Sequence, residues 1–495
     1  MLSMPSQEVG SKYSPVQSVL LITLLFAACK IFYNLYLHPL RKYPGPRLYS
    51  MSMAPYYLLT LRGTVHYKIK DFHDYYGDVV RLGPNMLVYR NAGAWKEIYG
   101  RKPGGGEFEK DPEHFYTHLL GINLLTAVEE DHTRMRRLLS HAFSNKALQE
   151  QEPILQGYLD VLIRRLRDFA LSNTAIDITR WLNYTTFDTI GDLAMGETFN
   201  CLGHDSLHPW VEATFLSSKY ATLLRPFINL IPPALVNIPI PENLKFFRND
   251  NYRYTKEAVS RRLARDSSRP DFMSYILRHN DEKGMTRDEI ESNQGILIVG
   301  GSETSATLLS GCCYYLLTHP EVYDRLVGEI RKAFQRNEDI TLLATAKIPY
   351  LTAVLEESLR KYPPLAGINP RCVPTGGAVI NGQFVPAGTS VSVGFLSAFQ
   401  SSSNFAEPDS FIPERWLNDN DPRFKHDNKE AFQPFSYGPR NCLGRTMAYG
   451  SMRMILAQLL WNFDMSLEKP HNDWDHQLAF TNWEKPPLML RLTAR

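Results

Sequence analysis

The stretch at residues 434–444, PFSYGPRNCLG, decides how the rest of the chain is interpreted, because it sets Cys442 in an unusual place. Arg440 precedes this cysteine closely, and Gly438 and Gly444 lie on either side of it. A long apolar segment follows, so a helix is expected to begin here. A structural cysteine suits the middle of an apolar run, whereas a nearby arginine and a helix start favour a thiolate. The stretch therefore indicates a cysteine held for chemistry.

The composition is that of an ordinary globular protein, with 44% apolar and 21% charged residues in a chain of 495. This length favours more than one domain. A formal net charge of +2 gives no sign of nucleic acid as a partner. The six cysteines include no CxxC spacing, so they predict neither a disulfide framework nor a zinc site and favour a reducing compartment.

The N-terminal segment from Val16 to Leu37 is largely apolar, and its core VLLITLLFAAC, residues 19–29, carries no charge. It is long enough to span a bilayer. A cleaved signal peptide is the alternative, and FAAC resembles a bacterial lipoprotein cleavage site. Lys12 is the only basic residue upstream, and the apolar stretch continues past Cys29. Both points favour an uncleaved membrane anchor.

The segment after the anchor, residues 38–47, HPLRKYPGPR, holds three prolines, which predict a stiff, extended connector. Its basic residues Arg41, Lys42 and Arg47 place the body on the cytoplasmic side of the membrane. The expected organisation is an N-terminal tail and membrane anchor at 1–37, a proline-rich hinge at 38–47 and a catalytic domain at 48–495.

The longest helical signal runs from a capping box at Thr286 to a His-Pro pair that ends it. It is nearly all apolar after Ile296, so we expect this helix to pass through the body. The sequence GGSETS, residues 300–305, interrupts it. One interpretation is a packing contact through glycine, with Thr304 bonded to its own helix. The other is a widened groove in which Glu303 and Thr304 handle protons.

A second helix is expected from Pro349 to Tyr362, with Glu357 and Arg360 on one face, where they are able to pair. Arg415, in the segment FIPERW, is able to join them. Strand signals are sparse and predict hairpins at 78–89 and 378–393 and a short strand near the C-terminus. The fold class is therefore mainly α with small accessory β-sheets (α+β).

Four motifs occur in one order: GGxET in the long helix, ExxR in the second helix, PER at 413–415, and FxxGxRxCxG at 435–444. With them the chain resembles the cytochrome P-450 family of haem-thiolate enzymes, from about Pro44 to Arg495. The N-terminal anchor resembles that of microsomal members. The resemblance implies the cytochrome P-450 fold, preceded by one transmembrane helix, and haem b (iron protoporphyrin IX) as cofactor.

The resemblance also implies which residues form the site. Cys442 is expected to be the axial ligand of the haem iron. The expected catalytic residues are Thr304, which would help to protonate bound dioxygen, and Glu303, which would relay protons. The ExxR pair and Arg415 would support the cysteine loop, and basic side chains would neutralise the two haem propionates. The expected cofactor-binding residues are His132, Arg136, Arg371, Phe435, Arg440, Cys442 and Gly444. Many relatives carry tryptophan where His132 stands.

The implied function is a monooxygenase that hydroxylates or epoxidises a hydrophobic small molecule, a terpenoid or polyketide intermediate of fungal secondary metabolism. Trichothecene hydroxylases are one example of the enzymes it resembles. The chain has no flavin-binding segment, so electrons are expected from an NADPH-cytochrome P-450 reductase, with cytochrome b5 as an accessory donor. Dioxygen and the membrane are further expected partners. The expected location is the endoplasmic reticulum membrane, single-pass, with the catalytic domain in the cytoplasm.

Two other functions stay open: a haem-thiolate isomerase or dehydratase that consumes no dioxygen, and a non-catalytic haem sensor or carrier. The acid and hydroxyl of Glu303 and Thr304 favour dioxygen activation, because peroxide-rearranging members often lack this pair. By the resemblance, the substrate pocket draws on residues 104–126, 202–241, 296–304, 366–369 and 480–481. One departure from the family is Ser451, where many fungal relatives carry glutamate.

Overall fold

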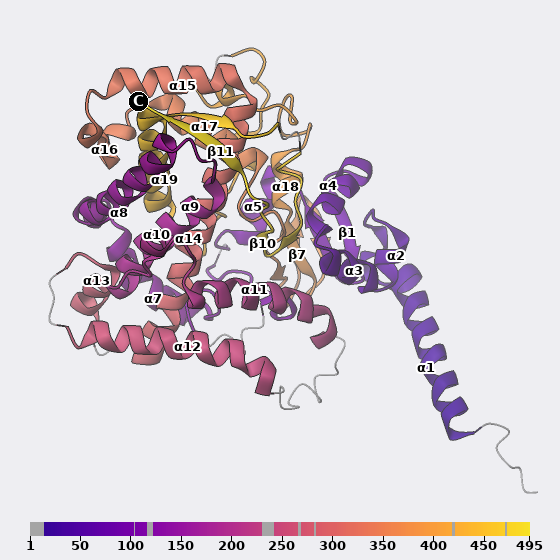
Figure 1. Ribbon diagram of the computed structural model, residues 1–495. Coiled ribbons are helices and arrows are strands. Elements are labelled where there is room, and N and C mark those ends of the chain that lie inside the picture. The colour runs from indigo at the N-terminus through magenta and orange to yellow at the C-terminus, as the bar shows by residue number, and fades with distance from the viewer. Residues whose placement is uncertain are drawn as a thin grey trace, which may run out of the picture.

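Helix α14, Arg287–Thr318, runs through the centre of the molecule, and other helices pack around it (Figure 1). The computed structural model describes residues 14–102, 104–115, 122–229, 242–265, 269–281, 284–417, 421–470 and 473–495. The Thr286 hydroxyl accepts the backbone N–H of Glu289, and the Glu289 carboxylate accepts the backbone N–H of Thr286. This capping box satisfies two N–H groups at the helix start. The predicted capped helix through the body is confirmed.

The other α-helices surround α14 or lie at the edge of the body. They are α1 (Pro15–Phe32), α2 (Arg47–Met51), α3 (Ala54–Arg62), α4 (Val65–Tyr76), α5 (Ala92–Tyr99), α6 (Pro112–Phe115), α7 (Glu129–Ser140), α8 (Asn145–Leu171), α9 (Ile178–Met195), α10 (Cys201–His204), α11 (Pro209–Ile228), α12 (Glu242–Leu263), α13 (Phe272–His279), α15 (Pro320–Ala333), α16 (Leu342–Thr345), α17 (Pro349–Lys361), α18 (Phe395–Phe399) and α19 (Arg445–Asn462). Helix α9 packs along α14, and α17 and α19 also contact it.

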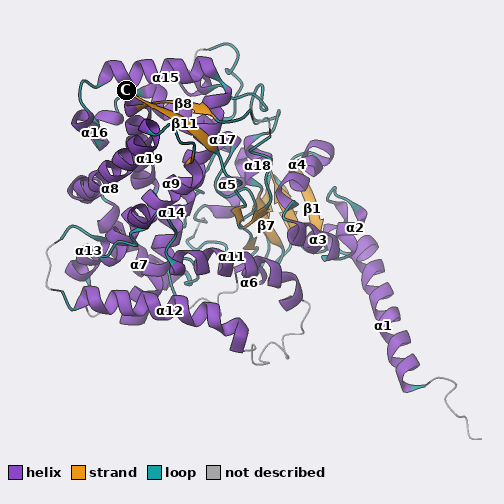
Figure 2. Ribbon diagram, viewed as in Figure 1, coloured by secondary structure: helices purple, strands orange, loops and turns teal. Residues whose placement is uncertain are grey.

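The strands are short and lie in small sheets, with β8 and β11 near the C-terminus and β1 and β7 beside α3 and α4 (Figure 2). They are β1 (Val79–Gly83), β2 (Met86–Tyr89), β3 (Ile176–Asp177), β4 (Arg371–Cys372), β5 (Ala378–Ile380), β6 (Gln383–Val385), β7 (Ser390–Val393), β8 (Phe463–Leu467), β9 (Ala479–Phe480), β10 (Asn482–Trp483) and β11 (Met489–Ala494). Among the described residues the sheet orders are β1-β2-β7-β4, β3-β11-β8, β5-β6 and β9-β10. The predicted class, mainly α with small accessory sheets, is confirmed.

Both predicted hairpins form, and the second is shorter than expected. Strands β1 and β2 pair antiparallel across the first turn. In the second, β5 and β6 pair around Asn381 and Gly382, whose φ angles are 50° and 71°. Two positive φ angles are the signature of a tight hairpin turn. Strand β7 follows this hairpin and pairs parallel with β2. It therefore belongs to the sheet of β1 and β2, whereas β5 and β6 form a separate sheet.

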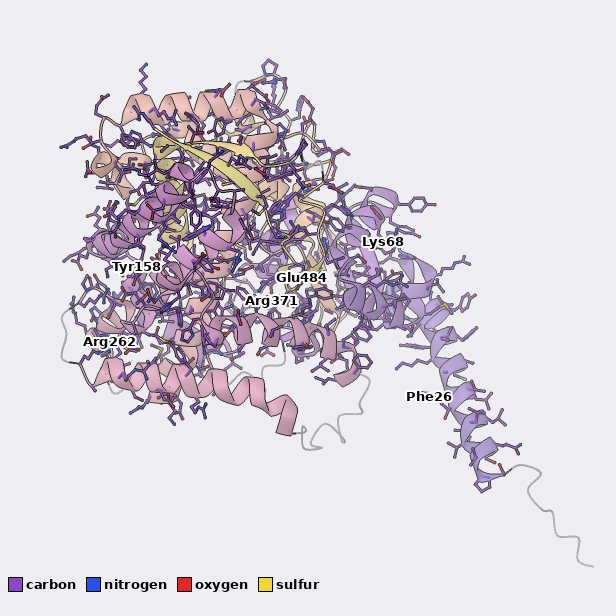
Figure 3. All side chains as sticks on the ribbon, in the orientation of Figure 1. Phe26, Lys68, Tyr158, Arg262, Arg371 and Glu484 are labelled. Atoms are coloured by element: carbon purple, nitrogen blue, oxygen red, sulfur yellow. The ribbon has the colours of Figure 1, made fainter. Side chains whose placement is uncertain are left out.

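Helix α1 projects from the body, and none of its residues is buried (Figure 1). Phe26 on this helix is 68% exposed and points away from the rest of the molecule (Figure 3). The segment Pro15–Leu37 has a mean hydropathy of 1.9, and by length and composition it is a candidate membrane span. Helix α14 has a comparable composition, but 67% of its apolar window is buried in the core.

The connector between α1 and α2 is not extended throughout, so that prediction is wrong for part of the segment. Residues Pro39–Lys42 form a 3₁₀ turn, and Leu40 is fully buried. Just before it, the Asn34 side chain donates to the Met51 carbonyl at 2.9 Å. The connector therefore packs against the body, because Leu40 is apolar and gains by leaving water.

Candidate active site

The loop before α19 turns sharply so that Cys442 is presented at the start of that helix. The Cys442 backbone N–H donates to the Phe435 carbonyl at 2.8 Å, and the Asn441 N–H donates to the Gly438 carbonyl at 3.1 Å. Gly438 has φ +76°, and a Cβ there would lie 2.0 Å from the Tyr99 carbonyl oxygen. Only glycine fits this position, because both its backbone angle and its close neighbour exclude a side chain.

Gly444 lies in a different backbone region from Gly438. Its φ is −84°, and a Cβ there would meet only ordinary contacts, with the Cys442 sulfur at 4.0 Å and Phe143 at 3.8 Å. The turn of this loop therefore does not require glycine at position 444, because this φ is open to any residue. What Gly444 does contribute is its backbone N–H, which lowers the pKa of the Cys442 thiol.

The Cys442 side chain is exposed, whereas Cys201, Cys312 and Cys313 are buried. Protein atoms still lie close enough to the sulfur that desolvation raises the pKa of the Cys442 thiol. Arg136 and Arg445 act in the opposite direction, because positive charge favours a thiolate. The Phe435 ring lies near the same region, 5.1 Å from the Tyr449 ring, with the Arg445 guanidinium 5.8 Å from its centre.

Four cationic side chains surround His132, which is buried on α7. Burial, followed in order of effect by the charges of Arg440, Arg136, Lys110 and Arg371, lowers the pKa of His132 to about 3. These residues come from α7, from β4, from the cysteine loop and from the segment before α6. Histidine is therefore neutral in this surrounding, and a strongly positive field fills the region beside it.

Each member of this cation cluster, Lys110, Arg136, Arg371 and Arg440, has a different set of partners. Arg371 is buried, and its Nε and Nη1 have no hydrogen-bond partner among the described residues. Arg440 forms an ion pair with Glu107 and donates to the Ala127 carbonyl at 2.8 Å. Lys110 donates to the Leu125 carbonyl, and burial lowers its pKa well below the usual value.

These charges make the region a receptor for a dianion. Glu107 pairs with Arg440 and also acts on Lys110 and Arg371, so this carboxylate leaves the cluster with excess positive charge in a partly buried place. Buried cations without anionic partners are costly, and unpaired guanidinium N–H groups add to the cost. Two propionates of a haem would supply the missing negative charge and the missing acceptors. The residues present therefore fit haem beside Cys442.

Comparison with known proteins agrees with this geometry. The family model for Cytochrome P450 matches residues 44–491. The chain belongs to the cytochrome P450 family. It is 48% identical over 472 residues to the cytochrome P450 monooxygenase astJ of Aspergillus oryzae, covering 94% of each chain. It is 40% identical to an averantin hydroxylase of Dothistroma septosporum, covering 95% of this chain and 90% of the relative. It is 41% identical to a trichothecene C-15 hydroxylase of Fusarium sporotrichioides, covering 95% and 96%.

The chain is accordingly an oxidoreductase, a cytochrome P450 monooxygenase with the P450 fold and haem b as cofactor. The predicted family and reaction class are confirmed. Its relatives are fungal monooxygenases and hydroxylases of secondary metabolism, so the isomerase or dehydratase alternative is not favoured. Membership of the family implies a redox partner, an organic substrate and dioxygen.

In this P450, the GGSETS segment is part of an unbroken α-helix. The Thr304 hydroxyl donates to the Gly300 carbonyl at 2.7 Å. A Cβ at Gly301 would lie 3.2 Å from Ile190 of α9, so this glycine allows close helix packing. A Cβ at Gly300 would meet nothing within 4 Å. Gly301 and Thr304 therefore match the packing interpretation, while Gly300 leaves open space beside Thr304.

Glu303 faces a different partner from Thr304. Its side chain is only 5% exposed and forms an ion pair with Lys485, which lies between β10 and β11 and is 7% exposed. The Thr307 hydroxyl donates to Glu303 Oε1 at 3.1 Å and accepts from Lys485 Nζ at 2.6 Å. Glu303 Oε2 has no hydrogen-bond partner among the described residues. The acid is thus held on one oxygen and free on the other.

The ExxR motif forms a fully buried network rather than a surface pair. Both oxygens of Glu357 bind Arg360, at 2.9 and 2.8 Å. Arg415 Nε donates to Glu357 Oε1 at 3.2 Å, and the Trp416 indole N–H donates to Oε2 at 2.9 Å. The predicted association of Arg415 is confirmed, whereas the neighbouring Glu414 binds Arg325 instead.

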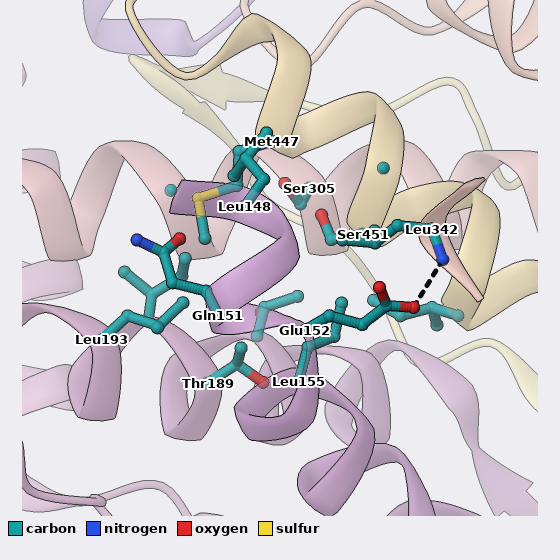
Figure 4. Close-up of a pocket in the computed structure, with 15 residues that line it drawn as sticks. Leu148, Gln151, Glu152, Leu155, Thr189, Leu193, Ser305, Leu342, Met447 and Ser451 are labelled. Carbon is teal, nitrogen blue, oxygen red and sulfur yellow. Dashed lines mark hydrogen bonds between the residues drawn. The ribbon is translucent and has the colours of Figure 1, made fainter. Parts of the chain in front are cut away.

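A cavity of about 40 Å³ lies between α8, α9, α14 and α19 (Figure 4). Gly301 and Ser305 line it from α14, and Ser451 lines it from α19. Glu152 at its rim accepts the Leu342 backbone N–H at 2.7 Å. Its lining includes neither Cys442 nor the cation cluster, so it is separate from the cofactor region. Ser451, where many fungal relatives carry glutamate, lines this cavity, so a longer side chain at this position would occupy part of it.

Sequence reasoning missed Glu107, Lys110, Thr307 and Lys485. Glu107 and Lys110 stand in a loop rich in charge, EFEKDPEH, where no pattern separates them from solvated neighbours. Lys485 meets Glu303 across 182 positions of sequence, a contact that local patterns do not reveal. Of the predicted pocket segments, residues 116–121 and 230–241 lie outside the described residues.

Proposed function

We propose that this P450 hydroxylates or epoxidises a hydrophobic terpenoid or polyketide intermediate of fungal secondary metabolism. The observation that carries the proposal is the cation cluster around His132, which Arg136 connects to the loop that presents the exposed Cys442. The printed functions of its relatives, averantin hydroxylase and trichothecene C-15 hydroxylase, support a substrate of this kind.

The cysteine loop and the cation cluster would hold the cofactor. When bound, haem supplies the iron at which dioxygen is reduced and from which one oxygen atom passes to the substrate. Cys442 would bind that iron as thiolate, aided by the Gly444 N–H and by Arg136. Arg371 has free N–H groups for a propionate, and Arg440 would share its charge between Glu107 and a propionate. His132 is positioned to donate an N–H, and Phe435 to exclude water.

Two residues of α14 would manage protons. The second oxygen atom of dioxygen leaves as water, which requires two protons at the distal side. The Thr304 hydroxyl donates its hydrogen bond to the Gly300 carbonyl, so its oxygen has lone pairs that can accept a hydrogen bond from another donor. Glu303 would relay protons through Oε2, which is buried and has no hydrogen-bond partner among the described residues. A carboxyl group in this role must be reachable yet partly desolvated, and Glu303 is buried.

The location and electron supply follow from the N-terminus. We infer a single-pass protein of the endoplasmic reticulum membrane, with residues 1–37 as tail and anchor, 38–47 as hinge and 48–495 as cytoplasmic catalytic domain. The unburied α1 supports this arrangement, and basic residues follow it. Electrons would come from a membrane-bound NADPH-cytochrome P450 reductase, with cytochrome b5 as an accessory donor.

Oxygen labelling tests the proposed reaction. The full-length protein, reconstituted with an NADPH-cytochrome P450 reductase in vesicles, would be incubated under ¹⁸O₂ with extracts containing fungal polyketides or sesquiterpenes. We expect one extract class to yield a hydroxylated or epoxidised product that carries ¹⁸O. Products without label would contradict the oxygen-insertion step, and the label must be absent with Cys442→Ser as control.

A further inference from the structure

Two neighbouring residues between β10 and β11 form ion pairs in opposite directions. Glu484, labelled in Figure 3, binds Lys219 of α11 at 2.9 Å, and both side chains are over a third exposed, at 41% and 35%. Lys485 turns inward and binds Glu303 of α14, where both side chains are less than a tenth exposed. One short segment therefore carries an outer, solvated pair and an inner, desolvated pair.

The inner pair is a closed arrangement of three groups. Lys485 Nζ donates to both Glu303 Oε1 and the Thr307 hydroxyl, and that hydroxyl donates to the same Oε1. Glu303 and Thr307 are four residues apart, which places them on one helix face. Two hydrogen bonds, from Lys485 and from Thr307, therefore hold Glu303 Oε1 in place. Oε2 is the oxygen without a partner among the described residues.

A carboxylate in this position depends on its lysine. Removing one partner from a buried ion pair leaves an uncompensated charge, which the protein avoids by protonation or by moving the side chain toward water. Adjacent helix residues such as Glu303 and Thr304 do not face one another, so the carboxylate reaches the side of Thr304 only from a defined position. The contacts with Lys485 and Thr307 fix the position of Oε1, and with it the direction of the carboxylate.

We propose that Lys485 is a positioning residue for proton delivery in this enzyme. It holds Glu303 in place by binding Oε1, and so leaves Oε2 as the oxygen that takes up and releases protons. This inference rests on the proton role proposed for Glu303 above, and it adds a residue outside the family motifs. Thr307 completes the arrangement by holding Oε1 from the same helix.

The partition of dioxygen tests this without knowledge of the substrate. The full-length haem-loaded protein would be mixed with reductase, NADPH and dioxygen, and hydrogen peroxide would be measured per NADPH consumed. Reduction by two electrons and two protons gives peroxide, and reduction by four of each gives two waters. We expect Lys485→Met to raise the peroxide fraction toward that of Glu303→Gln, and Lys485→Arg to stay near wild type. Glu484→Gln, which breaks only the outer pair, should also stay near wild type.

Each contrary result has a distinct meaning. If Glu303→Gln raises the peroxide fraction and Lys485→Met does not, only this inference is overturned. If Glu303→Gln has the same peroxide fraction as wild type, Glu303 has no role in proton delivery, and both that proposal and the present inference are overturned. If Glu484→Gln raises the peroxide fraction as much as Lys485→Met, the effect comes from loosening the segment and the positioning role is overturned.

A second measurement does not depend on turnover and protects against a variant that folds poorly. Thermal unfolding of Lys485→Met, Glu303→Gln and the double variant forms a double-mutant cycle. We expect the double variant to lose less Tm than the two single losses combined, because it leaves no unpaired buried charge. Additive losses would overturn the pair on which the inference stands.

Discussion

Arg136 binds Asn441 twice, through Nη1 to the backbone carbonyl at 2.7 Å and through Nη2 to Oδ1 at 2.5 Å. Asn441 immediately precedes Cys442, so this contact attaches α7 to the cysteine loop. The same guanidinium contributes positive charge beside His132 and favours the thiolate form of Cys442. One side chain thus fixes the loop that presents the sulfur and also supplies charge to the cofactor region.

Replacing Arg136 with methionine should weaken haem retention. The variant loses both contacts to Asn441 and one of the four cations around His132. Partners of metal ligands typically change metal affinity by about 10- to 100-fold, so we expect haem transfer to apomyoglobin to speed up by at least about 10-fold. Arg137→Met is the matched control, because Arg137 is exposed on the same helix. Equal haem loss in both variants would contradict the role of Arg136.

Substitution by alanine should disrupt the cysteine loop at Gly438 but not at Gly444. Gly438→Ala places a Cβ 2.0 Å from a backbone oxygen at a φ of +76°, so the loop cannot keep its shape. We expect this variant to lack the thiolate-type spectrum of the reduced, CO-bound protein. Gly444→Ala meets neighbours no closer than 3.8 Å and should keep that spectrum. Loss of the spectrum in Gly444→Ala alone would show that the turn is not what constrains this loop.

Much of the fold could be predicted because its signals are local. The capping box at Thr286, the Asn381 turn and the ExxR spacing each depend on a few adjacent residues, and each forms as expected. The cysteine loop also follows a contiguous motif. Such features need only backbone geometry and short-range hydrogen bonds, which residue order fixes directly.

The parts of the site that could not be predicted depend on distant contacts. Glu107 meets Arg440 across 333 positions, and Lys485 meets Glu303 across 182. Each is an ordinary charged residue in its own segment, and only the tertiary fold gives it a buried partner. The partner of the Glu303 side chain could not be predicted either, because the sequence places Glu303 on the helix but does not show which residue lies opposite it. The segment around Leu40 was expected to be extended but forms a packed turn, because Leu40 is buried against the body, a tertiary contact that the sequence does not show.

Replacing Thr304 with alanine should divert electrons into hydrogen peroxide. The variant loses the hydroxyl that now bonds to Gly300 and that would pass protons to dioxygen. General acid–base groups typically contribute about 10²- to 10⁴-fold, so a several-fold rise in peroxide per NADPH is expected with reductase present. Thr304→Ser keeps the hydroxyl and serves as control. An unchanged ratio in Thr304→Ala would remove Thr304 from proton delivery.

Truncation at two positions should separate membrane binding from stability. Removal of residues 1–32 takes away α1, which buries no residue, so we expect the protein to leave the membrane fraction with its Tm nearly unchanged. Removal of residues 1–47 also deletes Asn34, fully buried Leu40 and the Pro44 carbonyl that accepts from Arg81 at 2.7 Å. This second truncation should lower Tm. Sedimentation with vesicles and thermal unfolding measure both, and an equal Tm for the two would contradict a packed connector.

Glu357→Gln should destabilise the protein in a pH-dependent way. Burial alone would raise the pKa of Glu357, but Arg360 and Arg415 hold it below its usual value of 4.5. A depressed pKa contributes stability that is fully present above pH 4.5 and is lost as pH falls through the folded-state pKa. Breaking a buried network of this kind costs about 3–5 kcal/mol, so the urea midpoint should drop strongly at pH 7 and less below pH 4.5.

Glu356→Gln supplies the matched control for that pH series. Glu356 is adjacent on α17, but burial raises its pKa and its Oε2 has no partner among the described residues. A raised pKa means that the charged form is disfavoured in the folded state, so removing that charge should cost much less at pH 7. The difference between wild type and Glu357→Gln should narrow in acid, whereas Glu356→Gln should match wild type in acid and gain stability relative to it as pH rises. If both variants lose the same stability at every pH, the arginine network does not act through the charge of Glu357.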